Sequence, residues 1–260
     1  ASKHFPGNPR FVVRNITGAG GERGLIKTMK DTSGDGYSVV VIHPRFFKRE
    51  LLGDDVPEFD IGTVTLLGTP SASSEITGVY MMKETLSGRP LSWAGAAAYA
   101  ADNGPLTRGG NAPGDRGTVG ETFLEVLGHP IKMVHGYNGS SEIMAAFDRG
   151  ELDIGPGGSA NVTALFPEWV TDDRLVPLFR YGPSLEDDPA YVDWVTKVLG
   201  KETPPSIFDI FDATDGEKAV FALTETVNDS LSRTFALPPN VPQGLQDVWV
   251  KAFKDTIQDP

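Results

Sequence analysis

Short apolar segments alternate along this chain with longer segments of helical character, and this alternation constrains the fold more than any other feature. The expected strands are rich in β-branched and aromatic residues and span 10–15, 37–43, 60–67, 76–82, 106–109, 131–135, 152–154, 174–180 and 233–236. The expected helices span 22–30, 92–101, 117–127, 140–149, 190–199, 214–230 and 244–257. The alternation predicts an α/β fold of mostly parallel sheets with flanking helices, in which ligands bind at the carboxyl ends of strands.

Charge and composition exclude several classes of function. The 23 Lys and Arg residues against 35 Asp and Glu residues give a net charge of −12, which disfavours binding to nucleic acid and to anionic membrane surfaces. The chain contains no Cys, which excludes disulfides, thiolate zinc sites and Cys nucleophiles. No signal peptide and no apolar run long enough to span a bilayer is present, so we expect any export signal to have been removed or never to have existed.

The first candidate ligand loop is the glycine-rich segment 17–21, Thr-Gly-Ala-Gly-Gly, between an expected strand and an expected helix. Gly18 and Gly20 fit the start of a dinucleotide fingerprint, but Arg23 stands where its third glycine is required. Backbone amides at such a turn can bind a small anion such as a carboxylate. A tight turn without a ligand explains the glycines equally well.

Two further loops precede expected helices. In the segment 136–142, Gly-Tyr-Asn-Gly-Ser-Ser-Glu, Ser140 or Ser141 would cap the helix, and exposed amides and hydroxyls could hold a carboxylate. Tyr137 could supply a phenolic donor, or it could simply pack in the core. In the segment 113–118, Arg116 could bind a carboxylate through two hydrogen bonds or remain solvated.

The sequence contains no complete motif for metal binding or covalent catalysis. The segment 31–36 opens like a calcium loop, but Ile42 occupies the position that requires a bidentate Glu. His129 and His135 have no carboxylate partner at a ligand spacing, and no G-x-S-x-G elbow occurs. We therefore expect no metal, no cofactor and no catalytic residues.

Several segments, in order along the chain, resemble one family. Segment 136–143 (GYNGSSEI), followed by 146–153 (AFDRGELD), resembles the signature of TctC/Bug-type receptors, the periplasmic solute-binding proteins of tripartite tricarboxylate transporters. Segments 6–9 (PGNP), 15–21 (NITGAGG) and 236–242 (ALPPNVP) are similar to further elements of that family. Relative to the family pattern, the sequence begins after the first strand, loop and helix and ends before the C-terminal helices.

The resemblance implies a two-lobed fold that closes on its ligand like a Venus flytrap. It places residues 1–80 and 232–260 in one lobe and 81–231 in the other. The implied ligand-binding residues are Gly18, Ala19, Gly20, Gly21, Tyr137, Gly139, Ser140, Ser141 and, less directly, Thr118. It also implies a monomeric, non-enzymatic periplasmic protein that captures a small organic carboxylate (a di- or tricarboxylate, an aromatic acid or an amino acid) and delivers it to membrane transporter subunits.

Two alternatives remain open on the sequence. One is an enzyme for a small anionic substrate that would use His135, Asp115 or Glu121. The other is a ligand-responsive module that signals to a sensor protein. The sequence does not identify the carboxylate.

Overall fold

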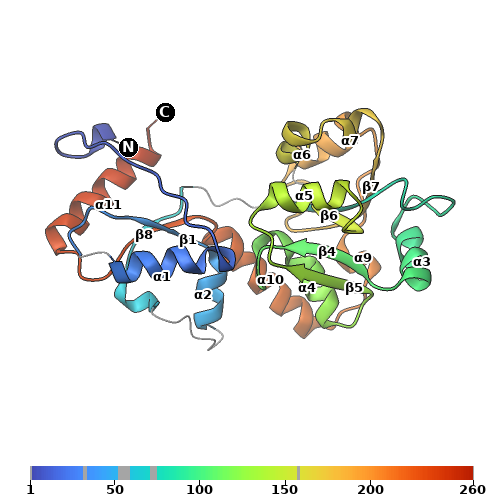
Figure 1. The fold of residues 1–260 in the computed structure, drawn as a ribbon, viewed down its shortest axis with the longest axis horizontal. Coiled ribbons are helices and arrows are strands. Elements are labelled where there is room, and N and C mark those ends of the chain that lie inside the picture. Colours follow the sequence, from blue (N-terminus) through green and yellow to red (C-terminus); the bar gives the residue numbers. More distant parts are fainter. Residues whose placement is uncertain (1, 32–33, 52–58, 71–74, 157–158, 260) are drawn as a thin grey trace. The chain divides into compact units, whose positions relative to one another are not determined.

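The computed structural model describes residues 2–31, 34–51, 59–70, 75–156 and 159–259 (Figure 1). The chain divides into two compact units. Unit 1 combines Ala1–Ser73 with Thr226–Pro260, and unit 2 is the continuous segment Ser74–Glu225. Unit 1 therefore takes its parts from both ends of the sequence.

Unit 2 contains a sheet of five strands in the order β5-β4-β6-β3-β7. The strands are β3 (Thr77–Met82), β4 (Leu106–Gly110), β5 (Ile131–His135), β6 (Ile154–Pro156) and β7 (Leu175–Tyr181). Strand β4 is parallel to both β5 and β6, whereas β3 is antiparallel to both β6 and β7. The α/β class is confirmed, but the sheet is mixed instead of mostly parallel. The alternation of strands and helices does not specify strand order. Strands β3 and β4 follow one another in sequence, but β6 lies between them in the sheet, and β3 runs antiparallel to β6.

Helices cover both faces of this sheet (Figure 1). They are α3 (Trp93–Asn103), α4 (Val119–Val126), α5 (Ser140–Asp148), α6 (Ser159–Leu165), α7 (Glu168–Thr171), α8 (Pro189–Asp193), a π-helical turn η5 (Trp194–Val198), α9 (Ile207–Ile210) and α10 (Asp215–Ser230). Alternation along β3 explains the two layers, because Val79 and Met81 belong to one buried cluster and Tyr80 and Met82 to the other.

Each face has its own apolar core. The first cluster joins the sheet to α3, α4, α9 and α10 through residues such as Ala96, Leu124, Ile207 and Phe221. The second cluster joins it to α5, α6, α7 and α8 through Phe147, Val162, Trp169 and Tyr191. Unit 2 is therefore a three-layer αβα sandwich that holds the strand ends in fixed positions.

Unit 1 contains a smaller sheet in the order β1-β8-β2. Its strands are β1 (Val40–Ile42), β2 (Thr65–Gly68) and β8 (Thr234–Leu237), and both pairings are antiparallel. Its helices and helical turns are η1 (Ser2–His4), η2 (Ala19–Gly21), α1 (Glu22–Asp31), α2 (Pro44–Leu51), η3 (Ile61–Thr63) and α11 (Gln243–Ile257). Its core includes Leu25, Ile42, Phe46, Phe47 and Ala236.

The expected parallel strand–helix–strand unit at the start of the chain is wrong. Residues 10–15 form no strand, and Val12 and Val13 are 69% and 86% exposed. Phe11 instead packs edge-on against Phe5 and Trp249, with ring centroids 5.2 and 5.9 Å away. Among the described residues, 10–15 have no strand partner, so the β propensity of Val and Phe is not realised there.

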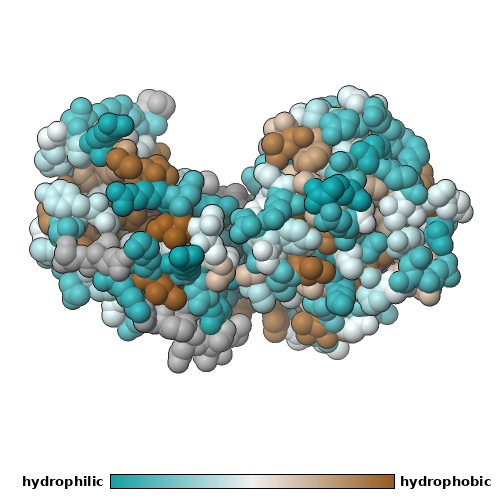
Figure 2. Space-filling model, viewed as in Figure 1, coloured by the Kyte–Doolittle hydropathy of each residue, from teal (hydrophilic) through white to brown (hydrophobic). Residues whose placement is uncertain are grey.

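The surface is mostly hydrophilic, with hydrophobic residues scattered among polar ones on the face shown in Figure 2. None of the described helices is long and apolar enough to cross a membrane.

Candidate functional site

Two of the candidate loops meet at one edge of the unit 2 sheet. Strands β4 and β5 run parallel in the register Gly109↔Val134 and Gly110↔His135, so their carboxyl ends lie side by side. The segments that follow them, 111–118 and 136–139, lead into α4 and α5. The sequence led us to expect ligand loops at the carboxyl ends of strands, and both loops follow such ends; the parallel pairing that brings them together is seen only in the structure.

Hydrogen bonds join the two loops directly. The Gly136 amide lies 3.1 Å from the Gly110 carbonyl oxygen and 3.3 Å from that of Asn111. The Asn111 side-chain amide donates to the Tyr137 carbonyl oxygen over 3.1 Å. The loops therefore form one connected rim.

The beginning of α5 differs in detail from expectation. Gly139 is the N-cap, and neither Ser140 nor Ser141 caps the helix, because α5 already starts at Ser140. The Glu142 carboxylate accepts hydrogen bonds from the Asn138 backbone amide (2.6 Å) and side-chain amide (3.1 Å), which fixes the turn. Ser140 and Ser141 are exposed at the first turn, where helix amides lack partners within the helix.

Tyr137 is half-buried and packs against the core cluster of α5 to α8. A Cβ atom added to Gly109 would lie 3.1 Å from Tyr137 Cε2, so the ring rests directly over the glycine backbone of β4. Its aromatic ring therefore has a packing role whether or not it also meets a ligand.

Arg116 and Thr118 belong to the helical turn η4 (Arg116–Thr118), which leads into α4. The Arg116 side chain lies outside the described part of the structure. Thr118 is 2% exposed, and its hydroxyl donates to the Asp115 carbonyl oxygen over 3.2 Å. The Thr118 side chain thus closes its own turn.

A buried ionic network that the sequence did not indicate lies beneath this rim. Arg108 in β4 donates from Nε to Glu121 Oε1 over 2.7 Å, and Tyr181 donates from its hydroxyl to Glu121 Oε2 over 2.9 Å. Burial, followed by the nearby Glu121 charge, raises the pKa of Tyr181 well above its usual value, so the phenol stays a donor. The three residues lie on β4, α4 and β7, and no local spacing rule pairs them.

In unit 1, the residues Gly18, Ala19, Gly20 and Gly21 form a loop and the turn η2 that starts α1. All four have positive φ angles, of 123°, 47°, 59° and 94° respectively. This left-handed conformation accounts for the glycines, and successive amides in it can form an anion-binding concavity. Ala19 also adopts this conformation, although its Cβ atom makes a positive φ unfavourable.

A basic side chain that sequence analysis did not single out holds this loop. Arg45 in α2 is 5% exposed and donates to the Ala19 carbonyl oxygen. It lies 3.6 Å from a carboxylate oxygen of Glu22, which also pairs with Arg49 at 3.0 Å. Its guanidinium carbon lies 4.4 Å from the centre of the Phe46 ring. These contacts explain how Ala19 is kept at positive φ.

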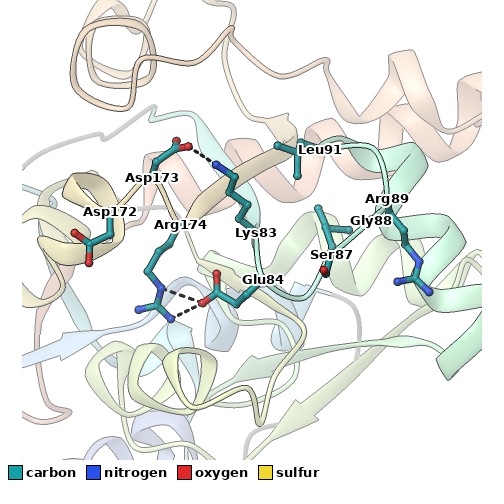
Figure 3. Close-up of a pocket in the computed structure, with 10 residues that line it drawn as sticks. Lys83, Glu84, Ser87, Gly88, Arg89, Leu91, Asp172, Asp173 and Arg174 are labelled. Atoms are coloured by element: carbon teal, nitrogen blue, oxygen red, sulfur yellow. Dashed lines mark hydrogen bonds and ion pairs between the residues drawn. The ribbon is translucent and has the colours of Figure 1, made fainter.

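A pocket of about 410 Å³ lies elsewhere in unit 2. Its lining comes from the segment after β3 and the turn before β7 and includes Lys83, Glu84, Arg89, Asp173 and Arg174 (Figure 3). Because β3 is antiparallel to β6, the end of β3 lies at the sheet edge opposite to the 111–118 and 136–139 loops.

The charged groups of this pocket neutralise one another. Lys83 pairs with Asp173 at 2.5 Å and Arg174 with Glu84 at 2.6 Å, as Figure 3 shows. Arg89 pairs with Asp102 at 2.8 Å. Hydrogen bonds from Lys201 and then Lys83 lower the pKa of Asp173 to about 2. We therefore place the candidate anion site at the loop rim, where no side chain caps the first-turn amides of α5, and not in this pocket.

In the described ranges, no group of three or more His, Cys, Asp or Glu residues could hold a metal ion. His129 instead packs against Phe211, with ring centroids 4.7 Å apart.

Comparison with solved structures identifies the fold. A periplasmic binding protein, BugD, has a TM-score of 0.59 at 17% identity, covering 96% of this chain and 72% of that one. MatC from Rhodopseudomonas palustris with bound malate has a TM-score of 0.58 at 12% identity, covering 94% and 71%. Rpa4515 of R. palustris with adipate has a TM-score of 0.52 at 17% identity, covering 94% and 71%. The chain therefore has the α/β fold of periplasmic binding proteins.

No family model matches the chain, and no curated protein matches it.

Proposed function

We propose that this chain is a periplasmic solute-binding protein that captures a small organic carboxylate. The observation that carries the proposal is the likeness of almost the whole chain to periplasmic binding proteins, two of which hold malate and adipate. The first-turn amides of α5, which no side chain caps, and the left-handed glycine loop before α1 support it, because oriented N–H groups bind carboxylates well.

The proposed ligand-binding residues are Gly18, Ala19, Gly20 and Gly21 in unit 1 and Tyr137, Gly139, Ser140, Ser141, Thr118 and Arg116 in unit 2. Backbone amides dominate this set, so binding is compatible with the net charge of −12: local dipoles act at contact, while distant charges are screened. Binding makes and breaks no covalent bond. We further propose that the protein is a monomer that delivers its ligand to membrane transporter subunits.

Thermal unfolding with added ligands tests the proposal. Malate, succinate and adipate are the probes, and putrescine is the matched control, because it has a similar length to adipate but carries positive ends. A ligand at 100 times its Kd stabilises the folded protein by about 2.7 kcal/mol, so at least one acid should raise the Tm while putrescine should not. Absence of any shift with the three acids, together with no heat of binding in calorimetry, would count against the proposed function.

The binding residues are tested separately with a Ser140→Ala/Ser141→Ala double variant. Both side chains are exposed, so the variant should keep the Tm of the free protein and lose affinity through the missing hydroxyls. Unchanged affinity would remove these hydroxyls from the site without affecting the proposed function. The proposed monomer is tested by light scattering after size-exclusion chromatography.

A further inference from the structure

The Arg108 guanidinium lies at the centre of the contacts that shape the loop before α4. Its side chain is 2% exposed and that of Glu121 is fully buried. Besides its bond to Glu121, Arg108 donates to the Gly109 carbonyl oxygen, and through a second terminal nitrogen to the Gly117 carbonyl oxygen over 3.0 Å. One side chain of β4 thus reaches its own strand, the end of the 111–118 loop and the first turn of α4.

The bond to Gly117 sets the direction of the peptide that follows. In a trans peptide the carbonyl and the next N–H point in opposite directions. With the Gly117 carbonyl turned toward Arg108, the Thr118 amide is turned toward the Asp115 carbonyl oxygen, 3.3 Å away. The Thr118 hydroxyl bonds to the same oxygen. Arg108 therefore stabilises the turn that leads from the 111–118 loop into α4.

Tyr181 presses the same helix end onto β7. A Cβ atom added to Gly120 would lie 2.4 Å from two atoms of the Tyr181 ring, so α4 approaches the ring as closely as only glycine allows. The Tyr181 hydroxyl also donates a hydrogen bond to the carboxylate of Glu121, the residue that follows Gly120 in that turn. The first turn of α4 is thus fixed from two sides.

A buried ion pair is weak evidence for stability, because desolvation of both charges offsets their attraction. An apolar set of similar volume often stabilises a core as well or better. Apolar side chains, however, could not donate a hydrogen bond to the Gly117 carbonyl oxygen as Arg108 does. The geometry of this network therefore points to a positional role.

We propose that Arg108, oriented by Glu121 and Tyr181, is a positioning residue that holds the 111–118 loop in the conformation that binds the ligand. The positional part stands on the geometry alone, and the ligand part rests on the proposed function.

Amide hydrogen exchange of the whole chain tests the positional part without any ligand. The triple variant Arg108→Met/Glu121→Met/Tyr181→Phe replaces the network with apolar side chains, and Asp193→Met/Lys197→Met removes an exposed ion pair of the same unit as a control. We expect exchange of the amides in 111–120 to rise at least about tenfold in the triple variant, with β3 unchanged. Wild-type rates in 111–120, or an equal rise throughout unit 2, would overturn the proposal.

The conservative variant Arg108→Lys tests the ligand part and guards against misfolding of the triple variant. Lysine keeps the charge but lacks the fork that reaches Glu121 and Gly117 together. With malate and adipate as probes, we expect a Kd at least about tenfold higher than for wild type and faster exchange in 111–120. A wild-type Kd with wild-type exchange contradicts the positioning role. If neither acid binds the wild-type protein, the proposed function fails for these acids, and the exchange rates still decide the role of Arg108.

Discussion

Replacement of Gly109 by Ala tests how tightly the loop rim is packed onto β4. The added Cβ would lie 2.7 Å from Leu152 Cδ1 and 3.1 Å from both Ile143 Cγ2 and Tyr137 Cε2. Leu152 Cδ1 and Ile143 Cγ2 are terminal methyl groups and Tyr137 Cε2 is a ring atom, so these side chains give way only by moving into a filled core. Overpacking of this kind costs about 1–3 kcal/mol. Gly109 does not have a positive φ, so Ala can adopt its backbone conformation. Ala also lowers the conformational entropy of the unfolded chain, which stabilises the folded protein by about 0.4–1 kcal/mol.

With an overpacking cost in the middle of its range, about 2 kcal/mol, the expected net loss of unfolding free energy for Gly109→Ala is about 1–2 kcal/mol. For a unit of this size that corresponds to a fall in Tm of about 2–8 °C. Urea unfolding followed by tryptophan fluorescence measures it, and Gly216→Ala is the matched control, because nothing lies within 4 Å of its added Cβ in α10. Gly216→Ala should be neutral or stabilising by up to about 1 kcal/mol. A Gly109→Ala protein as stable as the control would refute the packing argument.

Three further predictions concern stability. Trp169 is fully buried and donates from Nε1 to Asp148 over 2.8 Å, so Trp169→Ala should lose about 3–5 kcal/mol in urea unfolding, and a loss below 1 kcal/mol would contradict its core role. Asp173 has a pKa lowered to about 2, so its ion pairs should stabilise the protein above about pH 4 and fade as the pH falls toward 2. Because Asp173 is half exposed, the free energy of unfolding of the wild type should exceed that of Asp173→Asn by less than about 1 kcal/mol at about pH 6. In acid unfolding, the two free energies should become equal near pH 2. A Cβ atom added to Gly244 in α11 would have no atom within 4 Å, so Gly244→Ala should raise the Tm slightly. A lower Tm would contradict the absence of a steric contact there.

Element type and position were largely predictable from the sequence where local signals agree. The expected strands 106–109 and 131–135 and the expected helix 140–149 correspond to β4, β5 and α5 within one residue at each end. Each combines a clear apolar pattern with a glycine turn. The meeting of the 111–118 and 136–139 loops was not predicted, because it also requires β4 and β5 to be parallel neighbours in the sheet.

Strand direction and long-range contacts were not predictable in this way. An apolar strand has the same pattern in either direction, so nothing in the sequence showed that β8 pairs antiparallel with both β1 and β2. Residues 10–15 carry a strand pattern but form no strand, since a strand also requires a partner. Arg108 and Glu121 are 13 residues apart on different elements, which no periodic rule connects. Helix α2 (Pro44–Leu51) was missed, since it is only 8 residues long.

The division of unit 1 between the two ends of the sequence has a consequence for biosynthesis. Strand β8 (Thr234–Leu237) is the central strand of its sheet, so neither β1 nor β2 can pair until about residue 237 has left the ribosome. Unit 2 is continuous from Ser74 to Glu225 and can fold while synthesis proceeds. The core around Ile42, Phe46 and Phe47 is therefore incomplete until β8 has been synthesised and adds Ala236 to it. A chaperone that binds apolar segments has its longest opportunity in this interval.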